Sequence, residues 1–265
     1  MRVSVVIPCY NCGNTIRQCI QSVFNQTQPV DEIICIDDGS SDDTLFILKD
    51  LKLSSPQSIS FKIIVQKNSG PSSARNKGIQ VASYDWIAFL DSDDYWLDNK
   101  IEKDLLFIST QSDLVLLGSA FLKNNNSNEI SFSSLLFKNY FITSSVLVDR
   151  RYLISKKLSF DVDKKYSEDY LLWLMLTLNG KAFLKSPKTT FSIDSLKEKD
   201  GFFIGEGLSS NLLKMEKGEL DNFLFLYKGK YITFITFLIV SFFSILKFFL
   251  RLILKFIHNI RCCRL

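Results

Sequence analysis

Two aspartates, Asp91 and Asp93, directly follow an apolar run from Trp86 to Leu90. Such a run is typical of a strand covered on both faces, and open α/β sheets bind ligands beyond the carboxyl ends of such strands. Residues two apart on an extended chain point the same way, so the two carboxylates can converge on one divalent cation that also binds substrate phosphates. The spacing predicts a metal-diphosphate site. The alternative is structural: Ser92, Asp93 or Asp94 caps the amphipathic segment that follows.

Alternating strand-like and helix-like segments must position these aspartates. The strand-like segments cover residues 3–7, 32–36, 61–65, 86–90 and 113–118. Helical patterns lie between them, and this alternation predicts an α/β fold with a mostly parallel central sheet and helices on both faces. Acidic residues, Asp37 and Asp38, also follow the second strand.

Local signals mark several element boundaries. Asn14 is expected to cap the first helix, and Pro71 suits the first position of a helix that presents Arg75 near its beginning. Residues 124–128 form a polar turn that suits a hairpin, and residues 146–148 form an apolar strand.

Glu168 and Asp169 introduce a strongly apolar helix over residues 170–178. Acids at a helix N-terminus are electrostatically favourable, so a structural explanation of this pair is available. A functional explanation comes from the resemblance described below.

The composition limits the class of protein. With 265 residues the chain can bury a full core, and it predicts one large domain or a domain with an appendage. The 23 Phe residues concentrate toward the C-terminus, which indicates an apolar tail. The net charge of +4 comes from Lys and Arg spread along the chain, so a nucleic-acid partner is not expected.

The cysteines indicate a reducing compartment. Six are present, and their uneven grouping does not resemble the disulfide framework of a small secreted domain. Cys9 and Cys12 have redox or zinc spacing, but the chain has one histidine and its main body has no second Cys pair. Buried free cysteines are the favoured interpretation. The apolar segment from Val3 to Ile7 is too short for an export signal.

Five motifs occur along the chain in one order. They are residues 3–11, Asp37-Asp38-Gly39-Ser40, Ala74-Arg75-Asn76-Lys77-Gly78, Asp91-Ser92-Asp93-Asp94, and Glu168-Asp169 with Trp173. Together they resemble the family-two glycosyltransferases of GT-A fold, over roughly residues 3 to 180. The resemblance implies a nucleotide-sugar-binding domain that transfers one sugar with inversion at the anomeric carbon. The expected donor is a UDP-sugar, and the expected acceptor is a lipid-linked glycan or polysaccharide in bacterial cell-surface glycan synthesis.

The resemblance also implies a donor site. Pro8 and Tyr10 would line the pocket for the base, where a flat side chain can stack. Asp38 would accept hydrogen bonds from the base or ribose, because an ionised carboxylate only accepts. Arg75 would approach the nucleotide with a permanently charged guanidinium.

The remaining matched residues carry the implied chemistry. Asp93 would be the direct ligand of Mg²⁺ or Mn²⁺, and Asp91 would be shared between ribose and metal, so that the cation neutralises the departing diphosphate. Asp169 resembles the general base that takes the proton from the acceptor hydroxyl.

Some features of the family are missing. The Gln-x-x-Arg-Trp motif of its processive synthases is absent, which disfavours a polymerising enzyme. The acceptor-loop histidine of many members has no counterpart, since the only histidine, His258, lies in the tail.

Three other classes compete with a glycosyltransferase. Phosphohydrolases with an Asp-x-Asp nucleophile carry it after the first strand, which here ends in Pro8-Cys9-Tyr10. A dinucleotide-binding oxidoreductase would need a Gly-x-Gly-x-x-Gly that is missing. A catalytically dead nucleotide-sugar-binding membrane protein is disfavoured by intact Asp93 and Asp169.

The C-terminal tail predicts an amphipathic helix in the membrane surface. Its uncharged run, Tyr231 to Leu246, has 16 residues, about 24 Å of helix against a hydrocarbon core of about 30 Å. A polar stripe follows one face of it: Thr233, Thr236, Ser241, Ser244, Lys247, Arg251, Lys255 and His258. The helix is expected to lie on the cytoplasmic face of the membrane, with Lys and Arg near anionic headgroups and the active site close to the lipid-linked acceptor.

Two alternatives for the tail remain, a packing or dimerisation helix and a single-pass anchor. The expected division is a catalytic domain over residues 1–200, a connector over 201–228, and a membrane-associating helix with a basic tail over 229–265.

Overall fold

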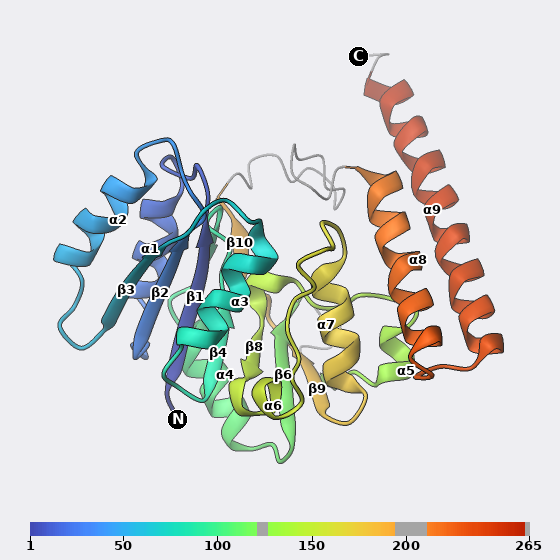
Figure 1. Ribbon diagram of the computed structural model, residues 1–265, viewed down its shortest axis with the longest axis horizontal. Helices are drawn as coiled ribbons and strands as arrows, with labels where there is room; N and C mark the ends of the chain where they lie inside the picture. Colours follow the sequence, from blue (N-terminus) through green and yellow to red (C-terminus); the bar gives the residue numbers. More distant parts are fainter. Residues whose placement is uncertain (121–126, 194–210, 263–265) are drawn as a thin grey trace.

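An eight-stranded sheet forms the centre of the fold, and the computed structural model describes residues 1–120, 127–193 and 211–262 (Figure 1). The strand order is β3-β2-β1-β4-β8-β6-β9-β7. The strands are β1 (Val3–Cys9), β2 (Glu32–Asp37), β3 (Ser60–Val65), β4 (Trp86–Phe89), β6 (Leu114–Ser119), β7 (Asn128–Glu129), β8 (Leu147–Asp149) and β9 (Lys181–Lys185).

The two halves of the sheet differ in strand direction. β3, β2, β1 and β4 are parallel neighbours, and β6 pairs in parallel with β9. β8 lies antiparallel between β4 and β6, and β7 is antiparallel to β9. The predicted α/β fold with a mostly parallel sheet is confirmed, with antiparallel insertions in its second half.

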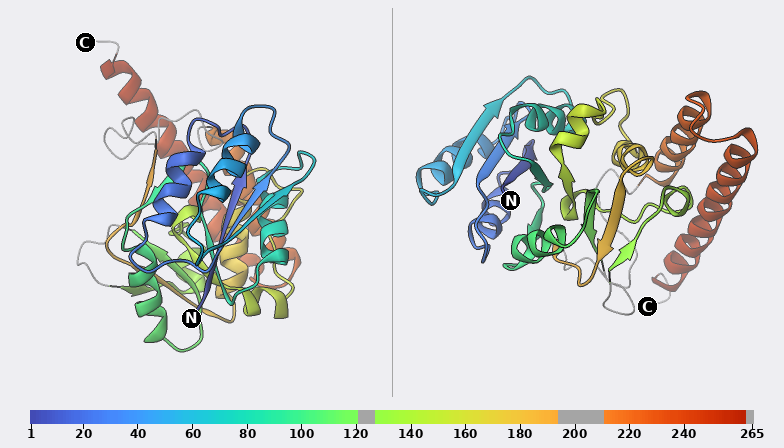
Figure 2. Two further views of the ribbon diagram at one scale, coloured as in Figure 1. Left: turned by 90° about the vertical axis from the view of Figure 1, so that its left-hand side faces the viewer. Right: turned by 90° about the horizontal axis from the view of Figure 1, so that it is seen from below.

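Alternate residues of the central strands face opposite sides of the sheet, and helices cover both sides. Val5 and Ile7 of β1 belong to a core cluster with α1 (Ile16–Phe24), α2 (Thr44–Leu53) and α4 (Lys100–Ser109). Val6 belongs to a second cluster with α3 (Pro71–Val81), α6 (Arg150–Ser155) and α7 (Glu168–Thr177). Figure 2 shows both helical layers, as the alternating sequence pattern predicted.

The segment after β4 does not begin a helix. Residues 91–94 form a turn, in which Asp94 N donates to Asp91 O at 3.0 Å. The chain then enters β5 (Asp94–Trp96), which pairs antiparallel with β10 (Thr190–Ser192). Helix α4 begins only at Lys100, and its N-cap is Asn99. The idea that Ser92, Asp93 or Asp94 caps this helix is therefore wrong, because these residues precede a strand.

Other boundary predictions had mixed outcomes. Pro71 begins α3 as predicted, and the predicted strand at 146–148 is β8. The cap at Asn14 is wrong: the N-cap of α1 is Thr15, and it makes no side-chain cap bond. Two main-chain donors, Thr15 N and Ile16 N, instead bind Cys12 O and close this turn. Most of the predicted 124–128 turn lies outside the described residues.

Helix α8 (Leu212–Lys228) packs on the loop that leads into α7. Asn222 Nδ2 donates to Ser167 O at 2.8 Å. A Cβ on Gly218 would lie 2.6 Å from Tyr166 O, so this close approach requires glycine. The division at residues 200 and 228 remains a prediction, and α8, from the predicted connector, packs against both α7 and α9.

Helix α9 (Phe234–Cys262) runs back along α8, and the two form an antiparallel pair at one end of the sheet (Figure 1). Part of its polar stripe faces α8. Lys247 Nζ donates to Glu219 Oε1 at 3.1 Å, and Ser244 is buried beside Glu216. Lys247, one of the basic residues expected near the headgroups, thus has a carboxylate partner on α8, and the expectation for the other basic residues of the tail stays a prediction.

Candidate active site

The loops after β1 and β2 carry the predicted base-binding residues at the carboxyl edge of the sheet. Pro8 is the last residue but one of β1, and Tyr10, just beyond this strand, is 53% exposed. Hydrogen bonds join the two loops: Asn11 N donates to Ser40 Oγ at 3.0 Å, and Ser41 N donates to Asn11 Oδ1 at 2.8 Å. The Tyr10 ring is thus held at this edge with its surface available for stacking.

Asp38 is buried and organises the loop that precedes α3. Its Oδ1 accepts from Gln66 Nε2 at 2.8 Å and from Ser69 N at 2.9 Å, and its Oδ2 accepts from Gly70 N at 2.8 Å. An ionised carboxylate has about four acceptor positions, so three are in use and one is left. Asp38 therefore builds the framework of the site and can still accept one bond from a ligand.

The Asp91–Asp94 turn ends β4 at the same edge. Asp91 N donates to Ser144 Oγ at 3.0 Å, and the Asp91 side chain is 30% exposed. Asp93 is exposed, and Asp93 O accepts from Ile193 N at 2.8 Å. Burial and the charge of Asp91 raise the pKa of Asp94 to about 7. The turn thus concentrates negative charge at one accessible point.

Arg75 of α3 joins the two acidic motifs. Its guanidinium donates to Asp91 Oδ1 at 2.7 Å and to Glu168 Oε1 at 3.2 Å. Arg75 is 6% exposed, and burial lowers the pKa of the guanidinium, but the carboxylates of Asp91 and Glu168 outweigh this and raise it. Asp91 and Glu168, which lie far apart in the sequence, are therefore bridged by one permanent cation.

Glu168 and Asp169 form the first turn of α7, beside Arg75. Burial and the neighbouring Asp169 raise the pKa of Glu168 to about 7. Burial also raises the pKa of Asp169, against the opposing charge of Arg75. Asp169 Oδ2 accepts from Thr143 Oγ1 at 3.0 Å, and its Oδ1 accepts from Tyr170 N at 2.7 Å. Acids here also suit the helix dipole, so the structural and functional explanations are compatible.

Sequence reasoning missed the 3₁₀ turn η1 (Thr143–Ser145), which contacts both motifs. Thr143 binds Asp169, and Ser144 binds the main chain of Asp91. Its Thr-Ser-Ser run matches no motif. The one available signal was its position directly before the buried strand β8, which lies next to β4.

The family model described as glycosyl transferase family 2 matches residues 4–162. The chain belongs to glycosyltransferase family 2. The matched range contains Tyr10, Asp38, Arg75, Asp91 and Asp93, and it ends before α7. The family predicted from the five motifs is confirmed, and the protein is a glycosyltransferase.

Relatives and solved structures agree with this family-2 assignment. The chain is 34% identical over 190 residues to the UDP-Glc:alpha-D-GlcNAc-diphosphoundecaprenol beta-1,3-glucosyltransferase WfaP of Escherichia coli, which covers 67% of this chain and 71% of the relative. S. aureus TarS 1-349 in complex with UDP-GlcNAc matches at a TM-score of 0.65 and 19% identity, over 84% of this chain and 67% of that one.

The mannosyltransferase PcManGT from Pyrobaculum calidifontis, in complex with GDP-Man and Mn2+, also matches at a TM-score of 0.65. Its identity is 14%, over 86% of this chain and 64% of that chain. At these identities the solved structures support the fold alone, which is GT-A-like.

The donor set of this glycosyltransferase fits a hard divalent cation. Asp91 and Asp93 offer carboxylate oxygens, the ligands that Mg²⁺ prefers, from one accessible turn. Within the described residues, no three His, Cys, Asp or Glu side chains converge as a ligand set. Mg²⁺ commonly completes its shell with waters and substrate phosphates, so a two-carboxylate site is compatible with it.

The four described cysteines near β1 and β2 are buried free thiols, as predicted: Cys9, Cys12, Cys19 and Cys35. Side-chain hydrogen bonding and burial raise the pKa of the Cys12 thiol strongly. These residues therefore pack as small apolar side chains behind the donor site of the transferase.

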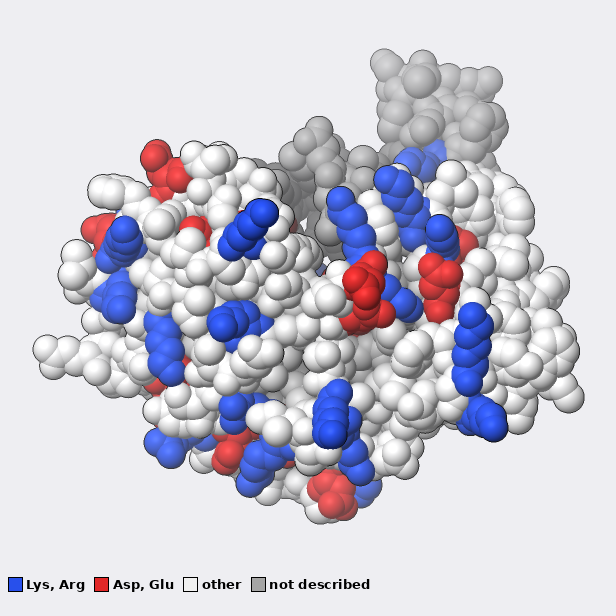
Figure 3. Space-filling view, viewed as in Figure 1, with Lys and Arg blue, Asp and Glu red and all other residues white. Residues whose placement is uncertain are grey.

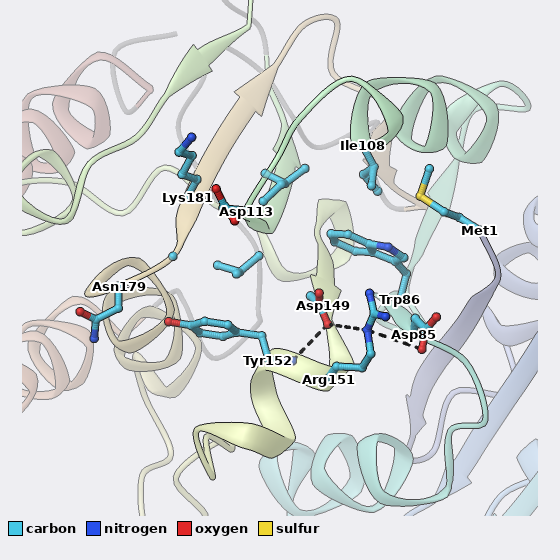
Figure 4. A pocket seen from close by; sticks show the side chains of 13 residues that line it. Met1, Asp85, Trp86, Ile108, Asp113, Asp149, Arg151, Tyr152, Asn179 and Lys181 are labelled. Atoms are coloured by element: carbon cyan, nitrogen blue, oxygen red, sulfur yellow. Dashed lines mark hydrogen bonds and ion pairs between the residues drawn. The ribbon is translucent and has the colours of Figure 1, made fainter.

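A cavity of about 680 Å³ lies at the opposite, amino-terminal edge of the strands (Figure 4). Three of its charged residues, Arg151, Asp85 and Asp149, have structural partners. Arg151 Nε lies 3.7 Å from Asp85 Oδ1 and 3.8 Å from Asp149 Oδ1, and Asp149 caps α6 by accepting from Tyr152 N at 3.1 Å. No predicted site residue of the transferase lines it.

The charged surface also distinguishes partner classes. On the face shown in Figure 3, Lys and Arg side chains are interspersed with Asp and Glu. This face offers no continuous basic strip of the kind that nucleic acids bind.

Proposed function

We propose that this family-2 glycosyltransferase is a metal-dependent, inverting hexosyltransferase that moves one sugar from a UDP-sugar to a lipid-linked acceptor. The observation that carries the proposal is the Asp91–Arg75–Glu168 bridge, which brings the Asp-x-Asp turn and Asp169 to one edge of the sheet. Attack on the anomeric carbon requires donor and base to lie side by side.

The nucleotide would occupy the loops after β1 and β2. Tyr10 would stack on the base, Pro8 would line the pocket, and Asp38 would use its remaining acceptor position for the base or ribose. Arg75 would fix the orientation of Asp91 toward the ribose, since one Asp91 oxygen already binds its guanidinium.

Asp91 and Asp93 would hold Mg²⁺ or Mn²⁺, which when bound would offset the negative charge of the diphosphate. Besides a bound metal ion, the guanidinium of Arg75 is a positive charge beside Asp91.

Asp169 would act as the general base. Burial raises its pKa, which increases its basicity compared with a solvated aspartate. It would take the proton of the acceptor hydroxyl as that oxygen attacks the anomeric carbon from the face opposite the leaving diphosphate. One displacement of this kind inverts the configuration.

The acceptor class rests on the relatives. The Escherichia coli proteins WfaP and WfgD carry names that specify a diphosphoundecaprenol-linked acceptor. A polyprenyl diphosphate glycan in surface-polysaccharide synthesis is therefore the acceptor we propose for this chain. Such a substrate lies in the membrane, so the enzyme must work at the cytoplasmic surface, where nucleotide sugars are available.

Helix α9 supports this location. The segment Phe234–Lys255 is long and apolar enough to cross a membrane by length and composition. Its face away from α8 is apolar and exposed, with Ile235, Leu238, Ile239, Phe242, Phe249 and Ile253 all at least half exposed. Because Lys247 pairs with Glu219 of α8 and Ser244 is buried on the same face of α9, we propose a helix that lies in the membrane surface rather than across it.

Metal-dependent turnover separates this enzyme from a catalytically dead binding protein. A panel of nucleotide sugars with a polyprenyl diphosphate acceptor, analysed by mass spectrometry with and without EDTA, should show one product that EDTA abolishes. Asp93→Ala should reduce turnover by about 100-fold or more. Asp50→Ala, which removes an exposed aspartate paired with Arg17, should behave like wild type. Metal-independent transfer by Asp93→Ala would sink the metal assignment, and a retained anomeric configuration would sink inversion.

A further inference from the structure

The turn η1 lies between the two acidic motifs and contacts both. All three of its residues are buried: Thr143, Ser144 and Ser145. Each makes a hydrogen bond to a different part of the molecule: Thr143 to α7, Ser144 to the Asp-x-Asp turn and Ser145 to α4. The position of this turn therefore affects the donor side and the base side together.

On the base side, Thr143 contacts Asp169 directly. The Thr143 hydroxyl donates to Asp169 Oδ2 at 3.0 Å, while Tyr170 N donates to Oδ1 at 2.7 Å. One donor on each oxygen restricts rotation of the carboxylate about its χ2 bond. Each oxygen still has acceptor capacity, so Asp169 remains able to take a proton.

On the donor side, Ser144 holds the start of the Asp-x-Asp turn. Its Oγ accepts from Asp91 N at 3.0 Å, and its main-chain O accepts from Trp96 Nε1 at 2.7 Å and from Thr190 Oγ1 at 3.2 Å. Ser144 thus binds Asp91, the first residue of the turn, and also strand β5 and its partner strand β10.

A buried cluster of charged side chains contacts η1 through Ser145. Ser145 O accepts from Lys100 Nζ at 3.1 Å, and Lys100 pairs with Asp104, which also pairs with Lys185 at 2.7 Å. The next residues enter β8 in the middle of the sheet. The turn is therefore fixed on two sides and cannot shift without breaking buried polar contacts.

We propose that Thr143 is a positioning residue for the transfer reaction, which orients the Asp169 carboxylate, while Ser144 fixes the Asp-x-Asp turn at a set separation from it. This inference rests on the proposed role of Asp169 as the base.

The charges that face Asp169 decide the direction of the expected pH effect. Arg75 lowers the pKa of Asp169, and Asp91 raises it. Glu168 shares the first turn of α7 with it. The Thr143 hydroxyl lowers the pKa of Asp169. Removing that hydroxyl raises the pKa, so a larger fraction of the base is protonated at a given pH, and the acidic limb of the activity profile moves to higher pH.

The test compares Thr143→Val, which removes the hydroxyl at similar volume, with Thr143→Ser, which keeps it. In the full-length enzyme, Thr143→Val should lower kcat about tenfold near neutral pH, leave the donor KM within about twofold, and move the acidic limb upward by up to about one pH unit. Thr143→Ser should show the acidic limb of the activity profile at the same pH as the wild type. Ser144→Ala should instead raise the metal concentration that gives half-maximal activity.

Two further outcomes decide the question. If Thr143→Val keeps the wild-type limb and kcat while Asp169→Asn is inactive, the positioning role is wrong and the proposed base stands. If Asp169→Asn keeps near-wild-type turnover, the proposed base itself is wrong. If Thr143→Val does not fold, Thr143→Ala is measured in its place. If Thr143→Ala binds UDP normally and the acidic limb of its activity profile is unmoved, the inference is wrong.

Discussion

At the residue scale, Arg75 decides whether the two acidic motifs act as one site. It is buried, and its guanidinium reaches two carboxylates that lie on different elements. A planar guanidinium can donate to both at once, whereas a lysine ammonium is a point charge on a flexible stem. The approach of Arg75 to the nucleotide stays a prediction, and the structure adds that Arg75 joins the turn after β4 to α7.

Arg75→Lys should keep the charge but lose one of the two bonds. We expect donor affinity and kcat/KM to fall about tenfold or more, with the protein folded. Arg75→Ala should in addition destabilise the fold by roughly 3 kcal/mol, because it leaves the partly buried carboxylates without their cation. Isothermal titration with UDP and thermal denaturation measure the two effects. Equal kinetics in wild type and Arg75→Lys would show that the bridge is not needed.

At the element scale, close packing of α3 on β1 places Arg75 at the edge of the sheet. Gly78 makes this approach possible, since a Cβ there would lie 2.3 Å from Val6 Cγ1 and 2.9 Å from Val6 Cγ2. Val6 is buried in the central strand, so it has no room to move aside.

Gly78→Ala should therefore destabilise the protein by about 1–3 kcal/mol, although alanine is the better helix former by about 1 kcal/mol. The shift of α3 should also weaken UDP binding through Arg75. Urea denaturation measures the first effect. Gln80→Ala, on the exposed face of the same helix, is the control and should change stability by less than about 0.5 kcal/mol. Unchanged stability in Gly78→Ala would show that α3 can move away from β1.

The sequence predicted elements best where burial set a clear pattern. The runs at β1, β2 and β4 are continuous and apolar because both faces of these strands are covered, and α7 is apolar for the same reason. The antiparallel direction of β8 could not be predicted from its own three apolar residues, because strand direction depends on partners that are distant in the sequence.

The site was predictable only where charged residues formed a motif. The strand β5 was missed because Ser92 and Asp93 suit helix caps as well as turns, and pairing with β10, about 100 positions away, decided the outcome. Thr143 was missed because a short neutral side chain forms no recognisable motif. Its contact with Asp169 depends on the fold, because β8 places the preceding turn between β4 and α7.

At the scale of the whole molecule, α9 is attached to α8 along one face, and among the described residues its other face is exposed. Its attachment includes Val240, Ser244 and Phe248, which are buried, and the Lys247–Glu219 ion pair. With 29 residues it is about 43 Å long, against about 25 Å for α8. In Figure 1 its C-terminal end lies toward the carboxyl edge of the sheet, where the active site is. A membrane against the outer face of α9 would therefore lie beside this end of the sheet.

Phe242→Glu combined with Phe249→Glu should abolish membrane binding without affecting the fold, because both side chains are more than half exposed on the outer face of α9. Flotation of the purified protein with vesicles measures this. Wild type should bind anionic vesicles more strongly than neutral ones, and salt should weaken the binding, since Arg251 and Lys255 are exposed on the same helix. Phe46→Glu, on the exposed face of α2, is the matched control and should bind like wild type.

Wild-type flotation by the double variant would rule out this face as the membrane contact. Resistance of the wild-type protein to carbonate extraction, with protease access to a C-terminal tag from the far side, would establish a span and separate α9 from α8.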